Sequence, residues 1–363
     1  EMRLSYNYFA DVIRGDVHTN GRTIFGRYYN NAWNPMGASI IGNVTAVRGV
    51  GSESIYLDEY DNTINTFLEG NLGLGSVSGT VNGYAASIAF PTQAQITTDL
   101  QTSADDYPDY FIHGSNPLYQ PYRDTNSLNM PYEVHMTLLG NQVQLDFRGP
   151  ASSITAPGPL LYTRTLPLPD HKLIYVEGRV TIKGDINGRL TVATSGANIY
   201  GNIVIGGNIR YVDNEGDRAY LLKKNGVVVD PDSTGAESWT AANGYTYESN
   251  PDYNPTVPSN LTLQARDAVV PSTLSYNLEV HSTALLFGNW YSGAVANGNK
   301  GNFRMVGSIV PNGGYGGNKH HYLLSTEIIH DPALLTNAPE WYPVDVNNSA
   351  IITTPTFTAW RKF

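Results

Sequence analysis

The sequence predicts an all-β chain built as one parallel β-helix, with a short N-terminal helix and two long inserted loops. Charged residues make up only 15% of the 363 residues, and 36 residues are glycine. Helical bundles and coiled coils need charged solvent-facing surfaces, so this composition disfavours them. Most of the sequence instead reads as short β runs broken by glycine, asparagine and aspartate. The length suffices for a single large solenoid domain over residues 1–363.

A short helix is expected near the start of the chain, over residues 6–14. Phe9, Val12 and Ile13 would share one of its faces, and Gly15 would end it. Elsewhere the sequence predicts strands.

The clearest repeat lies between residues 173 and 212. Apolar strand centres recur there at intervals of nine or ten residues, with glycines between them where corners would fall. These centres are Val180, Leu190, Ile199 and Ile209. Runs this short and regular favour a parallel β-helix with two or three strands per coil. A hairpin meander stays open as an alternative, because Asn187-Gly188 is a favoured hairpin turn.

Two stretches interrupt the repeat and are expected to be long inserted loops. Residues 105–132 are rich in proline and tyrosine, and residues 213–260 combine aromatic residues with glycine, asparagine, proline and serine. Loops of this length in a compact domain usually carry a function or move. Each is therefore either a flap that contacts a ligand or a loop that its aromatic residues fasten to the solenoid wall.

Charge and composition exclude several classes of function. The net charge of −10 repels a phosphate backbone, which disfavours a nucleic-acid partner. The absence of cysteine excludes disulfides, thiolate catalysis and zinc–sulfur sites. No apolar run is long enough to predict a membrane span. Glu1 precedes Met2, which suggests a chain trimmed from a longer precursor.

Paired carboxylates are the first candidates for catalysis, because many β-helical enzymes act on polysaccharides with acidic residues. The tightest clusters are residues 58–61 and Asp105-Asp106, and neither has a neighbouring lysine or arginine. Such pairs in glycine- and asparagine-rich sequence are more often solvated or bound to calcium than catalytic. We expect no enzyme activity and assign no catalytic residue.

Histidines are the candidates for metal binding. His18, His320-His321 and His330 lack the spacing that preorganises a zinc site. We expect His18 to satisfy polar groups in a turn. The sequence therefore implies no cofactor, leaves the metal ligands unknown and leaves a structural calcium ion open.

Aromatic residues are the strongest indication of function, since 25 tyrosines accompany only 10 phenylalanines. A flat aromatic ring can stack on the apolar face of a sugar. Parallel strands lie about 4.8 Å apart, so side chains two coils apart would stand roughly 10 Å apart, close to the repeat of cellulose. The predicted carbohydrate-binding residues are Tyr220, Trp239, Tyr245, Tyr247, Tyr253, Trp290 and Tyr291.

Three motifs resemble those of bacterial surface proteins associated with type IV pili. They are residues 15–21 (GDVHTNG), residues 174–192 and Ala265-Arg266-Asp267. Within that group, size, tyrosine content and missing cysteine look most like the C-terminal domain of tāpirins, cellulose-adhesion proteins of thermophilic plant-degrading bacteria. The resemblance implies a β-helix core, an extracellular location on the cell surface and non-catalytic binding to cellulose. Its motifs mark the framework, so it carries over no binding residues.

The expected function is a non-catalytic carbohydrate-binding adhesin that attaches a cell to crystalline cellulose, or another plant polysaccharide, through exposed aromatic residues. Type IV pilus components are further expected partners. One alternative is a β-helical polysaccharide lyase or glycoside hydrolase, which requires a groove with converging charged residues. The other is a structural pilus or envelope component, whose aromatic residues would be buried or would face a protein partner.

Overall fold

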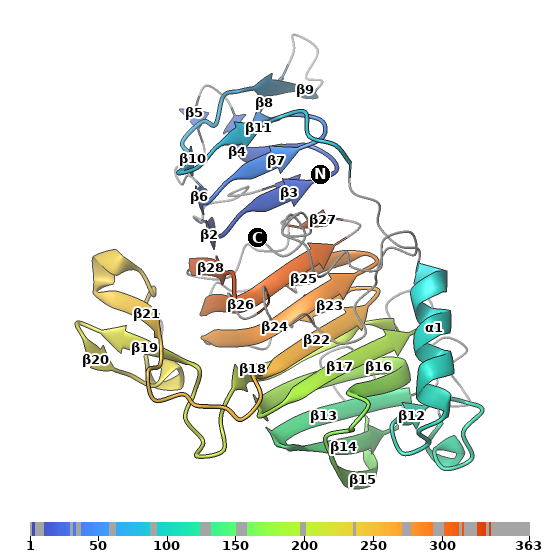
Figure 1. Ribbon diagram of the computed structural model, residues 1–363. Coiled ribbons are helices and arrows are strands. Elements are labelled where there is room, and N and C mark those ends of the chain that lie inside the picture. Colours follow the sequence, from blue (N-terminus) through green and yellow to red (C-terminus); the bar gives the residue numbers. More distant parts are fainter. Residues whose placement is uncertain are drawn as a thin grey trace.

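The computed structural model (Figure 1) describes most of the first 334 residues. The described residues are 2–3, 11–29, 32–33, 38–57, 63–87, 93–123, 132–149, 158–196, 201–234, 237–270, 277–292, 301–311, 314–315, 325–331 and 334. Within them the chain is mostly strand, with one α-helix, and the prediction of an all-β chain is confirmed.

Parallel strands stacked one above another form the larger part of the molecule, which we call the C-terminal stack (Figure 1). Its strands are β12 (Phe111–Ile112), β13 (Tyr132–Gly140), β16 (Leu173–Ile186), β17 (Arg189–Ser195), β18 (Ile203–Tyr211), β22 (Asn260–Ala265), β23 (Ala268–Val270), β24 (Leu278–Leu286), β25 (Asn289–Ser292), β26 (Asn302–Pro311), β27 (Gly314–Tyr315) and β28 (Ser325–Ile329). Ile174, Val192, Leu263, Ala284 and Ile309 follow one another in register and are all buried. Such apolar columns form the core.

Two long strands bend between faces of this stack. β16 pairs with β17 along its first half and with β18 along its second, and β24 likewise pairs with both β18 and β22. The strands β16, β17, β22, β24 and β18 therefore close a ring of parallel pairs. The bend in β16 needs glycine at Gly184, where φ is +108° and a Cβ atom would lie 2.2 Å from the Leu138 carbonyl oxygen.

The first part of the chain forms a second set of stacked strands, the N-terminal stack. These strands are β1 (Met2–Arg3), β2 (Asp11–Arg14), β3 (Val17–Thr19), β4 (Thr23–Tyr29), β5 (Ala32–Trp33), β6 (Ser39–Ile41), β7 (Val44–Ala46), β8 (Val50–Leu57), β9 (Thr63–Glu69), β10 (Ser76–Val77) and β11 (Val81–Asn82). They lie at the top of Figure 1 and continue the sheets of the C-terminal stack, since β28 pairs in parallel with β2.

The remaining elements lie at the sides and the lower end of the C-terminal stack. Helix α1 (Gln93–Asp105) packs beside β12 and β16, with Leu100 and Ala104 buried. At the lower end, β14 (Gln142–Arg148) and β15 (Leu160–Pro167) extend β13 as an antiparallel meander. Short 3₁₀ helices lie at Gln120–Tyr122, Pro231–Ser233 and Ala241–Asn243.

The predicted N-terminal helix is wrong where the structure describes it. Asp11–Arg14 is strand β2, held in parallel between β28 and β6, and residues 4–10 lie outside the described residues. Ile13 is buried while Arg14 is exposed, which is the alternation of a strand. The neighbouring strands decide the conformation of this short apolar run.

The meander alternative is wrong for residues 173–195. β16 and β17 run parallel, so Asn187-Gly188 is a corner between stacked strands and not a hairpin turn. Of the four predicted strand centres, Val180, Leu190 and Ile209 lie in strands, and Ile199 lies outside the described residues.

Both predicted loops contain regular structure. Residues 105–123 include the end of α1, strand β12 and a 3₁₀ helix. Residues 213–259 contain the antiparallel strands β19 (Tyr220–Lys224), β20 (Val227–Val228) and β21 (Tyr245–Ser249). We call this second insertion the flap.

Candidate functional site

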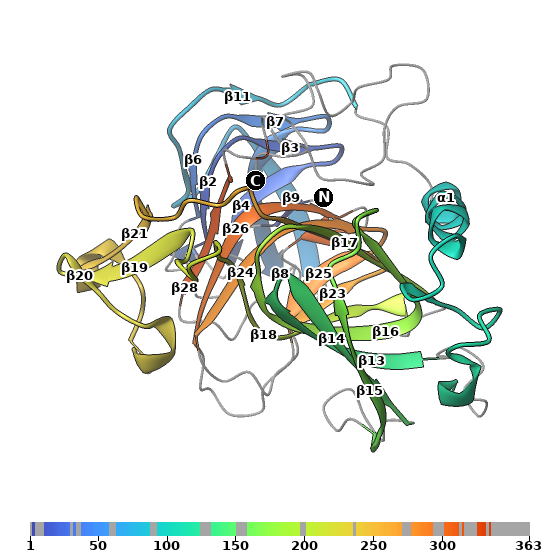
Figure 2. The ribbon, with the colours of Figure 1, turned by 60° about the horizontal axis from the view of Figure 1, so that its bottom comes forward.

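The flap stands at one side of the stack, between β18 and β22 in the chain (Figures 1 and 2). Its strands follow the order β20–β19–β21, separate from the large sheet. A hairpin turn with positive φ at Asn225 and Gly226 joins β19 to β20, as a two-residue turn requires. The flap is thus a small folded unit resting against the C-terminal stack.

Trp239 and Tyr245 lie in a small apolar cluster inside the flap. Together with Leu222 they form a core of their own, and each of the two rings is 4% exposed. The Trp239 ring nitrogen donates to the Thr234 hydroxyl at 2.9 Å. Neither ring presents a face on which a sugar could stack.

The other predicted aromatic residues do not form an exposed row either. Tyr220 and Tyr247 stack on each other with ring centroids 5.5 Å apart, and both are partly buried. Tyr253 is partly buried against the main core. Trp290 is buried within the stack beside Phe303, and the side chain of Tyr291 lies outside the described residues.

The expectation of exposed aromatic residues therefore has to be corrected for the described members of the set. The rings of Trp239 and Tyr247 lie over Arg304 of the stack, and the other described members pack against the apolar cores or on Tyr247. Binding of a polysaccharide by these residues stays a prediction.

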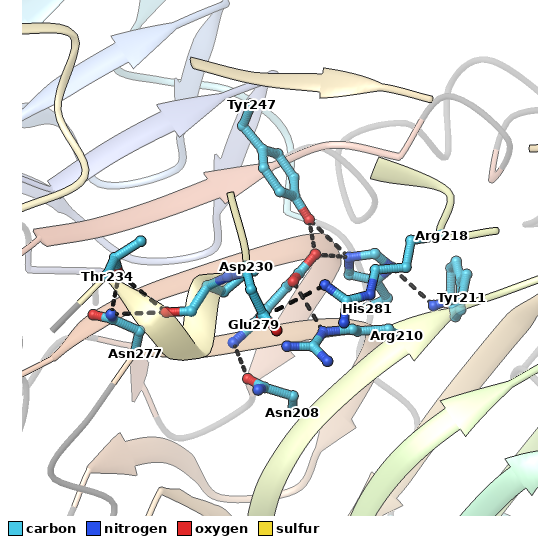
Figure 3. A network of polar contacts seen from close by, with 11 residues as sticks. Asn208, Arg210, Tyr211, Arg218, Asp230, Thr234, Tyr247, Asn277, Glu279 and His281 are labelled. Carbon is cyan, nitrogen blue, oxygen red and sulfur yellow. Dashed lines mark hydrogen bonds and ion pairs between the residues drawn. The ribbon is translucent and has the colours of Figure 1, made fainter. Parts of the chain in front are cut away.

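The charged groups beneath the flap centre on Glu279 of β24 (Figure 3). Its carboxylate accepts hydrogen bonds from the Tyr247 hydroxyl and, at 2.8 Å, from the His281 Nε2. Arg210 on the adjacent strand β18 donates its Nε to the other carboxylate oxygen at 3.2 Å. All three strand residues are buried, and His281 is fully so. Tyr247 brings a hydroxyl of the flap into direct polar contact with this group.

The backbone fixes the hydrogen-bonding role of each His281 ring nitrogen. The Tyr211 N–H donates to Nδ1 at 3.0 Å, so Nδ1 acts as an acceptor. Nε2 is then the donor, and it faces Glu279 and, at 2.9 Å, the Tyr247 hydroxyl. The imidazole acts here as a fixed donor.

This environment shifts two pKa values in opposite directions. Burial alone would raise the pKa of Glu279, but the hydrogen bonds from His281 and Tyr247 and the charge of Arg210 lower it to about 2. Burial, followed by the negative charge of Glu279, raises the pKa of Tyr247 well above its usual value. The carboxylate thus stays ionised and the phenol stays protonated, which keeps the hydrogen bond between them in place.

The charged row continues along the stack beyond Glu279. Arg304 of β26 is the register partner of Glu279 and forms an ion pair with Glu327 of β28. Glu327 also pairs with Arg14 of β2 at 2.6 Å. The guanidinium of Arg304 lies 4.5 Å from the ring centroid of Tyr247, a cation–π distance. Arginine and glutamate therefore alternate from β18 to β2, and the flap covers the middle of this row.

Amide side chains hold the edge of the flap on the stack. Asn302 accepts a hydrogen bond from the Trp239 N–H at 2.8 Å and donates to the Glu237 carbonyl at 2.6 Å. Asn277 donates to the Pro231 carbonyl at 3.0 Å and contacts the Thr234 hydroxyl (Figure 3). These bonds satisfy flap backbone groups that would otherwise be buried without partners.

The same side-chain group occurs a second time, at the lower end of the stack. Glu133 and His135 of β13 lie 3.2 Å apart, and Arg179 of β16 pairs with Glu133 at 2.9 Å. Both copies read Glu-Val-His in the sequence, at residues 133–135 and 279–281, with the central valine in the core. This repeat was visible in the sequence but was not used in the predictions above.

Among the described residues, the acidic and histidine candidates from the sequence are not brought together. Asp105 and Asp106 lie exposed at the end of α1, and residues 58–61 and 320–321 lie outside the described residues. His18 lies in strand β3 and not in a turn, and its ring contacts Thr45 and Asn20 side chains. Within the described residues, no three histidines or carboxylates are placed to hold a metal ion.

Comparison with known proteins adds little to this geometry. No known protein family matches the chain, and no curated protein matches it. One solved structure, the competence-associated pilin ComZ from Thermus thermophilus, aligns over 93% of this chain and 72% of that chain. The identity is 12% and the TM-score is 0.27, a value that does not show a common fold. No helix among the described residues is long and apolar enough to cross a membrane.

Proposed function

We infer that the chain is a non-catalytic structural component of a pilus or of the cell envelope. One observation carries this inference: the described aromatic residues expected to bind a polysaccharide are buried or partly buried, with Trp239 and Tyr245 in the core of the flap and Trp290 within the stack. Among the three functions considered, only a structural component requires its aromatic residues to be buried or to face protein. Cellulose adhesion would need a different, exposed aromatic face.

The repeated Glu-Val-His group supports a structural role for the charged residues. A group that forms an active site is expected at one place in a protein. The Glu-Val-His group occurs at two places in the stack, with similar ion pairs at each. In each case it joins two neighbouring parallel strands on the side opposite the buried valine. Such groups satisfy buried charges and fix strand register.

We also propose that the stack is a β-helix. Its successive strands lie in register, with Ala268 beside Trp290 and Trp290 beside Tyr315, as consecutive coils of a β-helix would. The resemblance of the framework motifs to pilus-associated surface proteins supports a location on the cell surface. A stiff stack of parallel strands suits a component that must keep its shape outside the cell.

Fractionation of the source cells, together with a cellulose pull-down, tests this function. We expect antibodies against the chain to detect it in the surface material removed by shearing. We also expect microcrystalline cellulose to leave the purified protein in the supernatant without release of reducing sugar. Depletion by cellulose would restore the adhesin, and retention inside the sheared cells would refute the envelope component.

A polysaccharide lyase is the second candidate, because four groups suited to acid–base chemistry converge at one place. Arg210, His281 and Tyr247 each hydrogen-bond Glu279, and Tyr247 also contacts His281. For a substrate to reach them, the flap would have to lift. Incubation with uronic-acid polysaccharides tests this candidate, since a lyase would generate an ultraviolet-absorbing double bond and a structural component would not.

A further inference from the structure

The order of the strands in space differs from their order in the chain. From the lower to the upper end, the sheets run through the C-terminal stack to β28 and then continue through β2, β6 and β10 (Figure 1). The last strands of the C-terminal stack thus support the first strands of the chain. The described strands form one continuous stack, whose two parts meet at a junction between β28 and β2, strands far apart in the chain.

Backbone pairing at this junction is as regular as within either part. Four residues of β2 face four residues of β28 in register, from Asp11 beside Thr326 to Arg14 beside Ile329. The His330 N–H extends this ladder by donating to the Arg14 carbonyl at 2.9 Å. A second pair of strands, β1 and β27, meets in parallel beside it.

Side chains make the junction both apolar and ionic. Ile13 lies beside Ile328 inside the core, and both are buried. Outside the core, Glu327 joins Arg304 of the C-terminal stack to Arg14 of the N-terminal stack. The surfaces that meet here are complementary, although they belong to segments far apart in the chain.

The backbone links the two stacks only through the segment between β11 and β12, which contains α1. This helix packs against β12 and β16, close to the end of the molecule remote from the junction. The N-terminal stack could therefore leave β28 without breaking the contacts of α1. Its partner surface would then be an open strand edge, which accepts any strand of matching sequence.

We propose that this junction exchanges between molecules, so that the N-terminal stack of one copy docks on β28 of a second copy. The exchanged and unexchanged forms contain the same strand pairs, so chain concentration decides between them. Each copy supplies one lower edge at β2 and one upper edge at β28. Because these edges differ, exchange is head-to-tail and yields rings or open chains of molecules.

The absence of cysteine from the sequence allows a direct test. Arg14 and Ile329 are register partners in neighbouring strands, about 4.8 Å apart, within the range that a disulfide spans. Two full-length variants, Arg14→Cys and Ile329→Cys, are unfolded, mixed, refolded together and oxidised. A disulfide between residues 14 and 329 can then form only between two molecules.

Ser39→Cys mixed with Ser76→Cys is the matched control. These two serines face each other across β6 and β10 inside one stack, with their hydroxyls 3.0 Å apart. We expect the 14–329 linkage, identified by mass spectrometry of the peptides, to increase with chain concentration and the 39–76 linkage to stay absent. Equal linkage in both mixtures, or no 14–329 linkage at any concentration, would overturn the proposal.

The unmodified chain provides a readout that needs no cysteine. We expect refolding at high concentration to give oligomers in size-exclusion chromatography with light scattering. The Arg14→Cys/Ile329→Cys double variant, oxidised as a folded monomer before concentration, should stay monomeric. Oligomers of the locked variant in equal amount would show that a different surface is responsible and would refute exchange at this junction.

Discussion

The two Glu-Val-His groups have the same chemistry and differ in their cover. In both, a glutamate accepts a hydrogen bond from a histidine two residues later and an ion pair from an arginine on the next strand. The side chain of His135 is 23% exposed, whereas His281 beneath the flap has no exposed surface. The flap also adds a third donor, the Tyr247 hydroxyl, to the second glutamate.

The comparison indicates that the flap covers the histidine and adds a donor, while the two ion pairs are equally buried. The side chains of Glu133 and Arg179, away from the flap, are 2% and 5% exposed, and those of Glu279 and Arg210 are 2% and 8% exposed. The Tyr247 hydroxyl donates to Glu279, whereas Glu133 Oε2 is buried without a hydrogen-bond partner. The flap also places the rings of Tyr247 and Trp239 over Arg304.

Removal of the carboxylate charge should have the largest effect and should differ between the two groups. We expect Glu279→Gln to lower the free energy of unfolding by about 3–5 kcal/mol, because it leaves Arg210 buried without its partner charge. Glu133→Gln also leaves a buried arginine, Arg179, without its partner charge, and should cost somewhat less only because Glu133 Oε2 accepts no hydrogen bond comparable with that from Tyr247 to Glu279. Urea denaturation of both variants measures the difference, and equal losses would show that the flap is irrelevant to it.

Loss of the flap's own core should be the next largest effect. We expect Trp239→Ala to lower the free energy of opening of the flap by about 3 kcal/mol. The effect should stay within the flap. Faster amide hydrogen exchange in β19 and β21, with unchanged exchange in β13, would show this. Val227→Ala is the control on the same flap, because Val227 is 66% exposed and should change stability by less than about 0.5 kcal/mol.

Acid should destabilise the protein by protonating the Glu279 carboxylate. The pKa of Glu279 is about 2 in the folded chain, against an ordinary value of 4.5. Its contribution is therefore complete above about pH 5 and is lost progressively as the pH falls towards 2. We expect Glu279→Gln to flatten this part of the curve of unfolding free energy against pH. An unchanged slope in the variant would contradict the assignment.

Removal of one hydroxyl should have the smallest effect of the series. Tyr247→Phe keeps the ring over Arg304 and the stacking with Tyr220 but loses the hydrogen bond to Glu279. A hydrogen bond to a charged acceptor contributes about 1.5–3 kcal/mol, so we expect a loss near the lower figure. A double-mutant cycle with Glu279→Gln measures the coupling, and a coupling of zero would show that the bond contributes nothing.

Local patterns in the sequence predicted the strands well. Val180, Ile182, Leu190 and Val192 alternate with polar residues, and all four are buried as expected. This holds because alternation and glycine corners act over a few residues. The helix α1 was missed because its sequence is largely polar, with only two strongly apolar residues, Ile96 and Leu100.

Such local patterns do not show which strands pair when they lie far apart in the chain. β17 pairs with β22 across the whole flap, and β2 pairs with the last described strand. In the candidate site, the repeated Glu-Val-His is visible in the sequence, but Arg210 lies 69 residues from its partner Glu279. The burial of Trp239 and Tyr245 also depends on the flap folding against the stack, which no local composition shows.

The junction also has a consequence for synthesis on the ribosome. Arg14 and its partner Glu327 are 313 residues apart in the chain. At about 5–20 residues per second, roughly 15–60 seconds pass between the emergence of β2 and of the strand that supports it. Throughout that interval the N-terminal stack has an unpaired lower edge. We therefore expect nascent chains to need protection from a chaperone until β28 has been made, whereas the C-terminal stack can grow strand by strand upon itself.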